Sequence, residues 1–544
     1  MKRAAKIVLG ILAVVVLVPL AVWKSGLLTP GVEPVPIASA PFAGPTLTRS
    51  PVTPTPLSGF AARPIQHPFQ AFEGGGLHGN AYNSDVHTTG GPSGRGELAV
   101  ISRRVSPLPG GVCPTITFTR EGLVVAMCAS FAGFEIDLFE PHTLRLLATH
   151  RLVTRPSTFE ALVKLDLDII FLDTSGGSYF YLDDQDRVVL TDAAQRLQRI
   201  AHRKRADGGY ELYVADSWDL TPYAPHDCFD VDNFFPAGEC DPVTSVMPDY
   251  TGRIWWVTRR GRVGTLDPAT GRVGVHHFAG EEIQNSLSSD DTGMYVITDH
   301  ALYAMVADEA GTPVVRWREE YPRADTYRYG NINIGSGSTP TLMDDERGRR
   351  YVAITDAGAD RTGLVVYRRE EQVSGPRQIC RVPLFGEAGS AVEISPIGWG
   401  RSLVVKNDSG YRSAFHGTSE ATIAGGMTRV DIREDDSGCD VVWTRPERVP
   451  AVVTKLSTNG LLYAYTFEEQ PGGENAWSFI AFDFASGAPV FERFVGLGKS
   501  FDINWGSPAI ARDGTVYLGI FKGILAIAER GGAAAATVAV TSGG

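Results

Sequence analysis

Eight copies of one strand-and-turn pattern constrain this chain more than any other feature. The last copy, residues 506–529, is the clearest: a short apolar strand, the turn Asp513-Gly514, a Val-Tyr strand, the turn Lys522-Gly523 and a third apolar strand. Short segments rich in Val, Ile and Tyr and bounded by Gly, Asp and Asn are typical of β-strands. A small β-meander cannot bury both of its faces by itself, so the copies must pack against one another. The pattern therefore predicts an all-β protein, a β-propeller.

The positions of the copies set the number of blades. The first strand of each copy is expected to begin near Cys113, Glu160, Val243, Asn285, Thr339, Glu393, Thr454 and Gly506. These starts favour eight blades over residues 113–530, or seven if one copy is misread. The long gap after the second copy indicates an insertion at about 203–242, and residues 531–544 are predicted to be a flexible tail. The last copy lacks a fourth strand, so ring closure needs one from elsewhere, and 98–105 in the lead-in segment 66–112 is the candidate.

The N-terminus has the features of a targeting segment. Lys2, Arg3 and Lys6 precede an uncharged apolar run, residues 7–23. Residues 1–23 are therefore either a signal-anchor that stays in the membrane as a transmembrane helix or a cleaved signal peptide, and both alternatives stay open. Either one would place the rest of the chain in an extracytoplasmic location, periplasmic or at the cell surface. Residues 24–65 are Pro-rich and are predicted to form an extended linker that holds the globular body off the membrane.

Charge and cysteine content narrow the class of protein further. The formal net charge is −12 and the longest basic run is the short patch 203–205, so a nucleic-acid partner is not expected. Six cysteines without a Cys-x-x-Cys motif fit disulfides in an oxidising compartment better than a redox dithiol or a zinc site. Six cysteines allow fifteen connectivities. Their positions favour three pairs: Cys113 with Cys128, Cys228 with Cys240, and Cys380 with Cys439.

Two of the copies, at 506–519 and 337–343, resemble the repeat of PQQ-like (quinoprotein-type) β-propellers, and this resemblance covers about residues 110–530. Quinoprotein dehydrogenases of this family are expected to carry a vicinal disulfide, tryptophan docking motifs in most blades and a calcium site beside the quinone. No two cysteines are adjacent here, and the docking motif is missing from the copies that align, so PQQ is not expected as a cofactor. The family also includes scaffolds of outer-membrane assembly that bind no PQQ, which implies an envelope protein as an alternative partner.

A second similarity concerns the starts of the inner strands. Gln284-Asn285 and Val392-Glu393 resemble the metal-ligand positions of gluconolactonase- and paraoxonase-type propellers, in which Asn, Asp or Glu residues hold a central calcium. Those hydrolases usually have six blades, so the match is an analogy of position. It implies a calcium ion held by Asn285, Glu393 and Asn504, where the ion would polarise the carbonyl of a lactone or ester. The alternative is that these side chains cap turns around a hydrated channel.

The densest polar cluster lies in the lead-in segment, at residues 78–87. We expect it to lie across the channel mouth, where His78, Asp85 and His87 could act as catalytic acid/base groups and Asn80 could contact a ligand. The alternative is a solvated loop that leads into the first blade.

Inner strands line the channel of a propeller, so polar groups at their starts converge although they are far apart in sequence. Further ligand-binding candidates are Glu160, Asn331, Asn333 and Lys455; the lysine either meets an anionic ligand or is a paired channel residue. The turn at 407–411 could also face the ligand. The first functional hypothesis is binding of a small-molecule ligand at the central channel mouth. The alternatives are a calcium-dependent lactonase or esterase and an envelope protein-protein scaffold, and whether the protein is an enzyme stays open.

Overall fold

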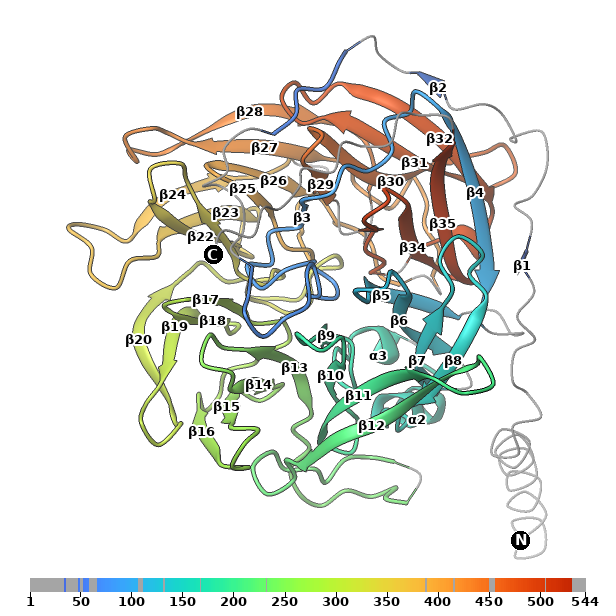
Figure 1. Cartoon of the computed structure of the whole chain (residues 1–544). Helices are drawn as coiled ribbons and strands as arrows, with labels where there is room; N and C mark the ends of the chain where they lie inside the picture. The colour runs from blue at the N-terminus through green and yellow to red at the C-terminus, as the bar shows by residue number, and fades with distance from the viewer. Residues whose placement is uncertain are drawn as a thin grey trace, which may run out of the picture.

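Eight antiparallel sheets surround a common axis in the computed structural model, and each forms one blade of a β-propeller (Figure 1). The structure describes residues 66–530, except 106–110, 131–132, 167, 231, 387–388, 414–415, 450–454 and 504, together with 34–35, 47–48 and 52–57. The prediction of an all-β propeller with eight blades is confirmed.

The blades follow the chain in order. Blade 1 contains β5 (Val112–Phe118), β6 (Val124–Ser130), β7 (Gly133–Phe139) and β8 (Leu146–Arg151); blade 2 contains β9 (Tyr181–Leu182), β10 (Val188–Thr191), β11 (Arg196–Lys204) and β12 (Tyr210–Asp219); blade 3 contains β13 (Val243–Pro248), β14 (Ile254–Thr258), β15 (Arg262–Leu266) and β16 (Val273–His277); blade 4 contains β17 (Ser288–Asp290), β18 (Gly293–Ile297), β19 (Ala301–Ala307) and β20 (Pro313–Glu320). Blade 5 contains β21 (Thr341–Asp344), β22 (Arg350–Thr355), β23 (Gly363–Arg368) and β24 (Gln378–Pro383); blade 6 contains β25 (Ile397–Trp399), β26 (Ser402–Lys406), β27 (Met427–Ile432) and β28 (Cys439–Arg445); blade 7 contains β29 (Lys455–Ser457), β30 (Leu461–Glu469), β31 (Asn475–Asp483) and β32 (Pro489–Leu497); blade 8 contains β33 (Ala509–Ile510), β34 (Val516–Ile520), β35 (Gly523–Arg530) and β4 (Glu97–Arg104).

The core lies between neighbouring blades, because successive side chains of a strand point to opposite faces of its sheet. In β14, Trp255 packs in a cluster with blade 4, whereas the next residue, Trp256, packs in a cluster with blade 2. Both faces of such a strand are buried, which explains why its residues are apolar without alternation. Gly264 on the paired strand β15 accommodates the indole, because a Cβ at that position would lie 2.0 Å from a ring atom of Trp256.

The ring closes through a strand from the lead-in segment. Antiparallel pairing joins β4 to β35 along its whole length, from Arg104 opposite Gly523 to Glu97 opposite Arg530. This is the strand that the sequence suggested for closure. Blade 8 therefore combines β4, from the start of the propeller sequence, with β33, β34 and β35 from its end.

The second copy of the repeat was misread. Its expected first strand near Glu160 is the helix α2 (Pro156–Lys164), and the apolar run after it is the short helix α3 (Asp168–Phe171). Proline at the first position of α2 favours a helix start, since it has no N–H to donate and its φ is already helical. The inner strand of this blade is β9, which begins about twenty residues after Glu160, and the expected insertion at 203–242 contains β12. The insertion therefore lies before blade 2 as well as after it.

Short N-terminal strands extend two blades at their outer edges. β1 (Pro34–Val35) pairs antiparallel with β4, and β2 (Leu47–Thr48) pairs antiparallel with β32. At these positions the predicted linker is attached to the propeller. The predicted signal-anchor or signal peptide, residues 1–23, and the predicted tail, 531–544, lie outside the described residues. Within the described ranges, no helix is long and apolar enough to cross a membrane.

The lead-in segment fills the central channel. Figure 1 shows the blue segment on either side of β3 (Val86–His87) inside the ring of blades. The backbone carbonyls of residues 81, 82, 84 and 85 accept hydrogen bonds at 2.9–3.0 Å from amides at the inner strands of blades 4, 5, 6 and 7 in turn. β3 then pairs in parallel with β29. We call residues 66–91 the plug. The expected loop across the channel mouth is thus a buried segment inside the channel, because its backbone groups find partners on the inner strands.

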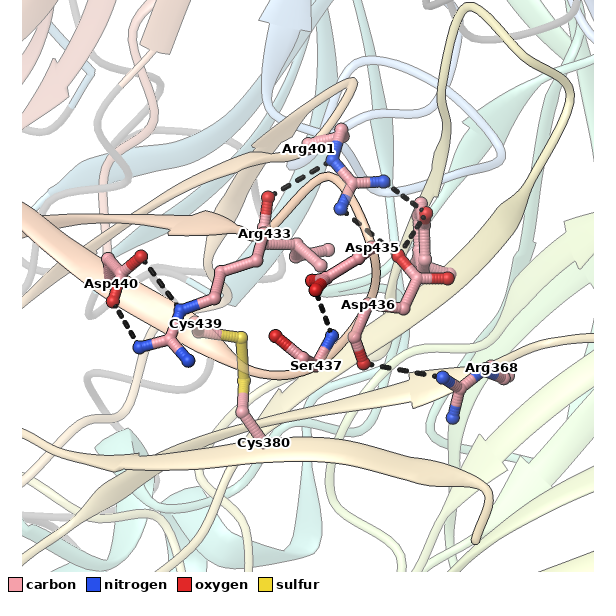
Figure 2. The surroundings of a disulfide bond; sticks show 11 residues. Arg368, Cys380, Arg401, Arg433, Asp435, Asp436, Ser437, Cys439 and Asp440 are labelled. Atoms are coloured by element: carbon pink, nitrogen blue, oxygen red, sulfur yellow. Dashed lines mark hydrogen bonds and ion pairs between the residues drawn. A yellow bond between two sulfur atoms is a disulfide. The ribbon is translucent and has the colours of Figure 1, made fainter. Parts of the chain in front are cut away.

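All three predicted disulfides are present. Cys113 pairs with Cys128 inside blade 1, and Cys228 with Cys240 closes the loop between blades 2 and 3. Cys380 with Cys439 joins β24 to β28, the outer strands of blades 5 and 6. Figure 2 shows this third bridge beside the ion pair of Arg433 with Asp440. Three disulfides fit an oxidising, extracytoplasmic compartment.

Candidate functional site

The two ends of the central channel have different borders. The first strand of every blade begins at one end, which we call the start mouth, and the segments between blades border it. The turns between the first and second strands border the opposite end, the end mouth. The helices α2 and α3 and the loop 407–426 between β26 and β27 belong to the start mouth. Polar residues predicted at inner-strand starts therefore lie at the start mouth or just inside it.

Asp85 is the centre of a buried network that anchors the plug. Lys455 of β29 forms an ion pair with one carboxylate oxygen of Asp85, and His78 Nδ1 lies 3.0 Å from the other. The ammonium of Lys455 also donates to the carbonyl of Leu77 at 2.7 Å, and Ser507 Oγ donates to the same carbonyl at 2.8 Å. Burial lowers the pKa of Lys455, while the charge of Asp85 opposes that shift. Of the two alternatives for Lys455, an anionic ligand or a partner inside the channel, these contacts support the partner inside the channel.

His87, the other histidine proposed as a base, is also engaged inside the channel. Its Nδ1 lies 2.8 Å from the carboxylate of Glu73, which in addition accepts hydrogen bonds from the N–H and the hydroxyl of Thr88. Burial favours the neutral form of Glu73, but the charge of His87 and these hydrogen bonds outweigh it and lower the pKa of that carboxyl. Asn80 bonds within the plug, to the N–H groups of Tyr82 and Ser84. These contacts fix the plug conformation.

Among the residues predicted for the site, Glu393 lies at the start mouth and has a carboxyl whose pKa is shifted. Its backbone N–H donates to Asp408 Oδ2 at 3.1 Å, and Asp408 forms a buried ion pair with Lys406. Burial and the negative charge of Asp408 raise the pKa of Glu393 to about 8, against the opposing effects of Lys406 and Trp505. At pH 7 this side chain is therefore mostly a neutral carboxylic acid, able to donate as well as accept a hydrogen bond.

Aromatic side chains surround Glu393. The tip of the plug, Leu77, packs with Ile394, and the partly buried rings of Tyr179 and Trp505 pack against both. Burial, followed by the nearby charge of Glu393, raises the pKa of Tyr327, whose side chain is 43% exposed. The plug thus closes the channel below the start mouth, and the carboxyl of Glu393 lies there next to the aromatic rings of Tyr179, Trp505 and Tyr327.

The predicted asparagines of the start mouth bond to backbone. Asn285 Nδ2 donates to the carbonyl of Ser336 at 3.1 Å, and Asn333 Oδ1 accepts from the N–H of Gly335 at 2.8 Å. Asn331 Oδ1 accepts from the N–H of Val392, next to Glu393, while its buried Nδ2 has no hydrogen-bond partner in the described part of the chain. Asn331 is therefore the asparagine with an unused donor at this mouth.

Two predicted site residues lie elsewhere. Glu160 lies on α2 and pairs with Lys164 at the surface, because the segment is a helix and not an inner strand. Asn504, the third proposed calcium ligand, lies outside the described residues. Among the residues that are described, no group of three or more His, Cys, Asp or Glu side chains is arranged to hold a metal ion.

One cluster at the start mouth was missed by the sequence reasoning. Asp168 of α3 lies 2.9 Å from Arg412 and from His416 Nδ1, and it accepts a hydrogen bond from Ser413 at 3.0 Å. The hydroxyl of Ser413 is also within hydrogen-bond distance of Nδ1 of His416. A Ser-His-Asp triad needs the serine and the carboxylate on different ring nitrogens, so this cluster is a contact between α3 and the 407–426 loop. The turn at 407–411 was the only signal for it in the sequence.

Comparisons with known proteins assign this chain to no family. No protein-family model matches the sequence, and no curated protein matches it either. Among solved structures, BamB from Moraxella catarrhalis aligns at 14% identity over 62% of this chain and 86% of its own, with a TM-score of 0.35. The computationally designed Ika8 protein aligns at 10% identity over 78% of this chain and 97% of its own, with a TM-score of 0.44. The propeller domain of Nup133 from Vanderwaltozyma polyspora aligns at 11% identity over 52% and 82%, with a TM-score of 0.33.

Proposed function

We propose that this protein is an extracytoplasmic binding propeller that takes a small, uncharged, hydroxyl-bearing ligand at its start mouth. The proposal rests on the position of Glu393 above the plugged channel, next to Asp408 and the Leu77–Ile394 cluster, where burial and the charge of Asp408 raise the pKa of its carboxyl to about 8. Because the plug fills the channel, a ligand would approach from the start side and meet Glu393 together with Tyr179, Trp505 and Tyr327. A neutral acid beside aromatic rings suits hydroxyl groups and apolar ring faces better than it suits an anion. Attachment to the membrane through residues 7–23 is part of the proposal and rests on the sequence.

The test is a thermal-shift and calorimetric titration of the full chain with neutral sugars, namely glucose, maltose and cellobiose. We expect at least one of them to bind, and Glu393→Gln to weaken that binding about tenfold, because an amide cannot donate and accept in the same geometry as a carboxylic acid. Tyr327→Ala should weaken it as well. The matched control is Glu434→Gln, since that side chain is 84% exposed on a distant turn.

Two results would contradict this proposal. One is that none of the three sugars binds. The other is that the Glu393→Gln variant binds a sugar as tightly as the unaltered chain does. Adding calcium chloride to the same titration tests the alternative of a calcium-dependent lactonase or esterase, which requires that the ion raise the melting temperature and that lactone hydrolysis disappear in chelator.

A protein-protein scaffold remains the second candidate, because one observation favours it. Large apolar side chains are exposed on the two loops that flank blade 2 at the start mouth: Leu165 is 90% exposed at the end of α2, and Phe235 is 92% exposed in the Cys228–Cys240 loop. Exposed apolar residues that gather on inserted loops are typical of interaction surfaces. Capture from an envelope extract by the unaltered chain, lost in a Leu165→Asp/Phe235→Asp variant, would support a protein partner.

A further inference from the structure

A cavity of about 200 Å³ opens at the end mouth, opposite Glu393. Its walls come from four parts of the chain that meet only in the folded protein. The plug contributes residues 70–73, and the first turns of blades 1, 2 and 8 contribute residues 118–120, 184 with 186, and 510 with 512. It is thus a hollow between the plug and three neighbouring blades, separate from the start mouth.

One wall of the cavity is apolar. Phe72, Phe118 and Ile510 line it. Phe72 is 38% exposed, although its neighbour Ala71 is buried. The guanidinium of Arg512 lies 5.2 Å from the centroid of the Phe72 ring, within the range of a cation-π contact. An aromatic ring with a cation above it and an open face remains accessible from the solvent.

Among the described residues, the guanidinium groups of the cavity have no carboxylate partner. Within the described ranges, neither Arg512 nor Arg120 forms an ion pair. The guanidinium of Arg120 donates to the backbone carbonyl of Asp184 at 2.7 Å, and its backbone N–H donates to Asp186 Oδ2 at 3.0 Å. These two contacts fix the position of Arg120, and no other hydrogen bond joins either guanidinium group to a residue that the structure describes.

The acidic residues of the cavity are less available. The carboxylate of Glu73 is engaged by His87 and Thr88, and one oxygen of Asp186 accepts the N–H of Arg120, while its other oxygen is buried with no hydrogen-bond partner among the described residues. Asp184 is exposed on its turn. Two guanidinium groups of the cavity are therefore free to bind, whereas the carboxylate of Glu73 is already engaged.

We propose that this end-mouth cavity binds a small organic carboxylate, with its apolar body against Phe72, Phe118 and Ile510 and its carboxylate on Arg512 and Arg120. Guanidinium groups bind carboxylates through paired N–H donors. The size also fits, because a cavity of about 150 Å³ accommodates benzene and this one is somewhat larger. A ring of that size with one carboxylate matches both the apolar wall and the two cations.

The experiment is isothermal titration of the full chain with sodium benzoate, with benzyl alcohol as the uncharged ligand of similar size. We expect benzoate to bind with a dissociation constant of about 1 mM or tighter and benzyl alcohol at least about tenfold more weakly, since a charged hydrogen bond is lost. Arg512→Gln and Arg120→Gln should each weaken benzoate about tenfold. Arg95→Gln, on an exposed loop outside the cavity, is the control.

The proposal is overturned if benzoate does not bind at about 10 mM, if benzyl alcohol binds equally well, or if both arginine variants bind benzoate as the unaltered chain does. Circular dichroism and melting temperature establish that each variant is folded before titration. The sugar titration of the Glu393→Gln variant addresses the other mouth, so the two proposals can fail separately.

Discussion

At the scale of single residues, Asp85 and Lys455 bring opposite charges into a channel that water hardly reaches, and His78 lies against the carboxylate. Asp85 and Lys455 are 0% and 1% exposed, and each is the other's partner. Replacing Lys455 by Met would leave the carboxylate of Asp85 buried without its cationic partner, with the ring of His78 still in contact. We expect Lys455→Met to destabilise the protein by about 3–5 kcal/mol, the usual effect of breaking a buried ion pair from one side. Urea unfolding followed by fluorescence measures it.

The double variant Lys455→Met/Asp85→Asn is the control for that prediction. It removes both charges, so it should destabilise the protein less than the sum of the two single variants. Strict additivity would mean that the two side chains do not stabilise each other in the folded protein.

The raised pKa of Glu393 predicts a dependence of stability on pH. The folded protein holds a proton on this carboxyl up to about pH 8, whereas the unfolded chain releases it near the ordinary value of 4.5. Between these values the folded state binds more protons, so stability falls as the pH rises and then levels off above about pH 8. We expect the urea midpoint to decrease from pH 5 to 8, and to decrease less in Glu393→Gln. An equal decrease in both proteins would assign the effect to other groups, such as Asp502, whose pKa burial raises to about 7.

Few of these residue contacts could be read from the sequence. The sequence singled out His78, Asp85 and Lys455 as polar residues near the channel, and the structure brings them together. It could not pair them, because residues 85 and 455 meet only after the ring has formed. The same holds for Glu393, whose pKa depends on Asp408 and on burial by the plug.

At the scale of elements, strands were easier to predict than the segments between them. Seven of the eight inner strands begin within a few residues of the expected positions, because short apolar runs bounded by Gly and Asp turns recur once in each blade. The second copy failed because the expected first strand near Glu160 is the helix α2, and the short apolar run of α3 that follows it, Asp168–Phe171, cannot be told from a strand. The plug has no periodic pattern at all, so its position could not be predicted.

The disulfides allow a prediction at this scale, because they close loops of different length. The Cys380–Cys439 bridge spans 59 residues and joins two blades, whereas Cys113–Cys128 spans 15 within one blade. Loop-closure entropy predicts that the longer bridge contributes more, about 4 kcal/mol against about 3 kcal/mol. We expect Cys380→Ser/Cys439→Ser to lower the denaturation midpoint more than Cys113→Ser/Cys128→Ser. The reverse order would mean that packing around the buried Cys113 outweighs the entropy of the longer loop.

At the scale of the whole molecule, one N-terminal segment completes both the ring and the channel. β4 supplies the outer strand of blade 8, and the plug, which precedes it in the chain, bonds to the inner strands of blades 4 to 7. The N-terminal part of the chain therefore contacts blades on every side of the axis, which couples blades that are not neighbours.

This arrangement predicts that two truncations behave differently. A chain that starts at residue 96 keeps β4 but loses the plug, so the ring can close around an emptied channel. A chain that starts at residue 111 also loses β4, which leaves the backbone groups of β35 unpaired at an exposed strand edge, and such edges promote association with other chains. We expect the first truncation to give a monomer with a lowered melting temperature and the second to give oligomers or aggregates in sedimentation velocity. If both truncations stayed monomeric with equal melting temperatures, the pairing of β4 with β35 would not hold the ring together, and the stability of the propeller would have to come from the contacts between blades alone.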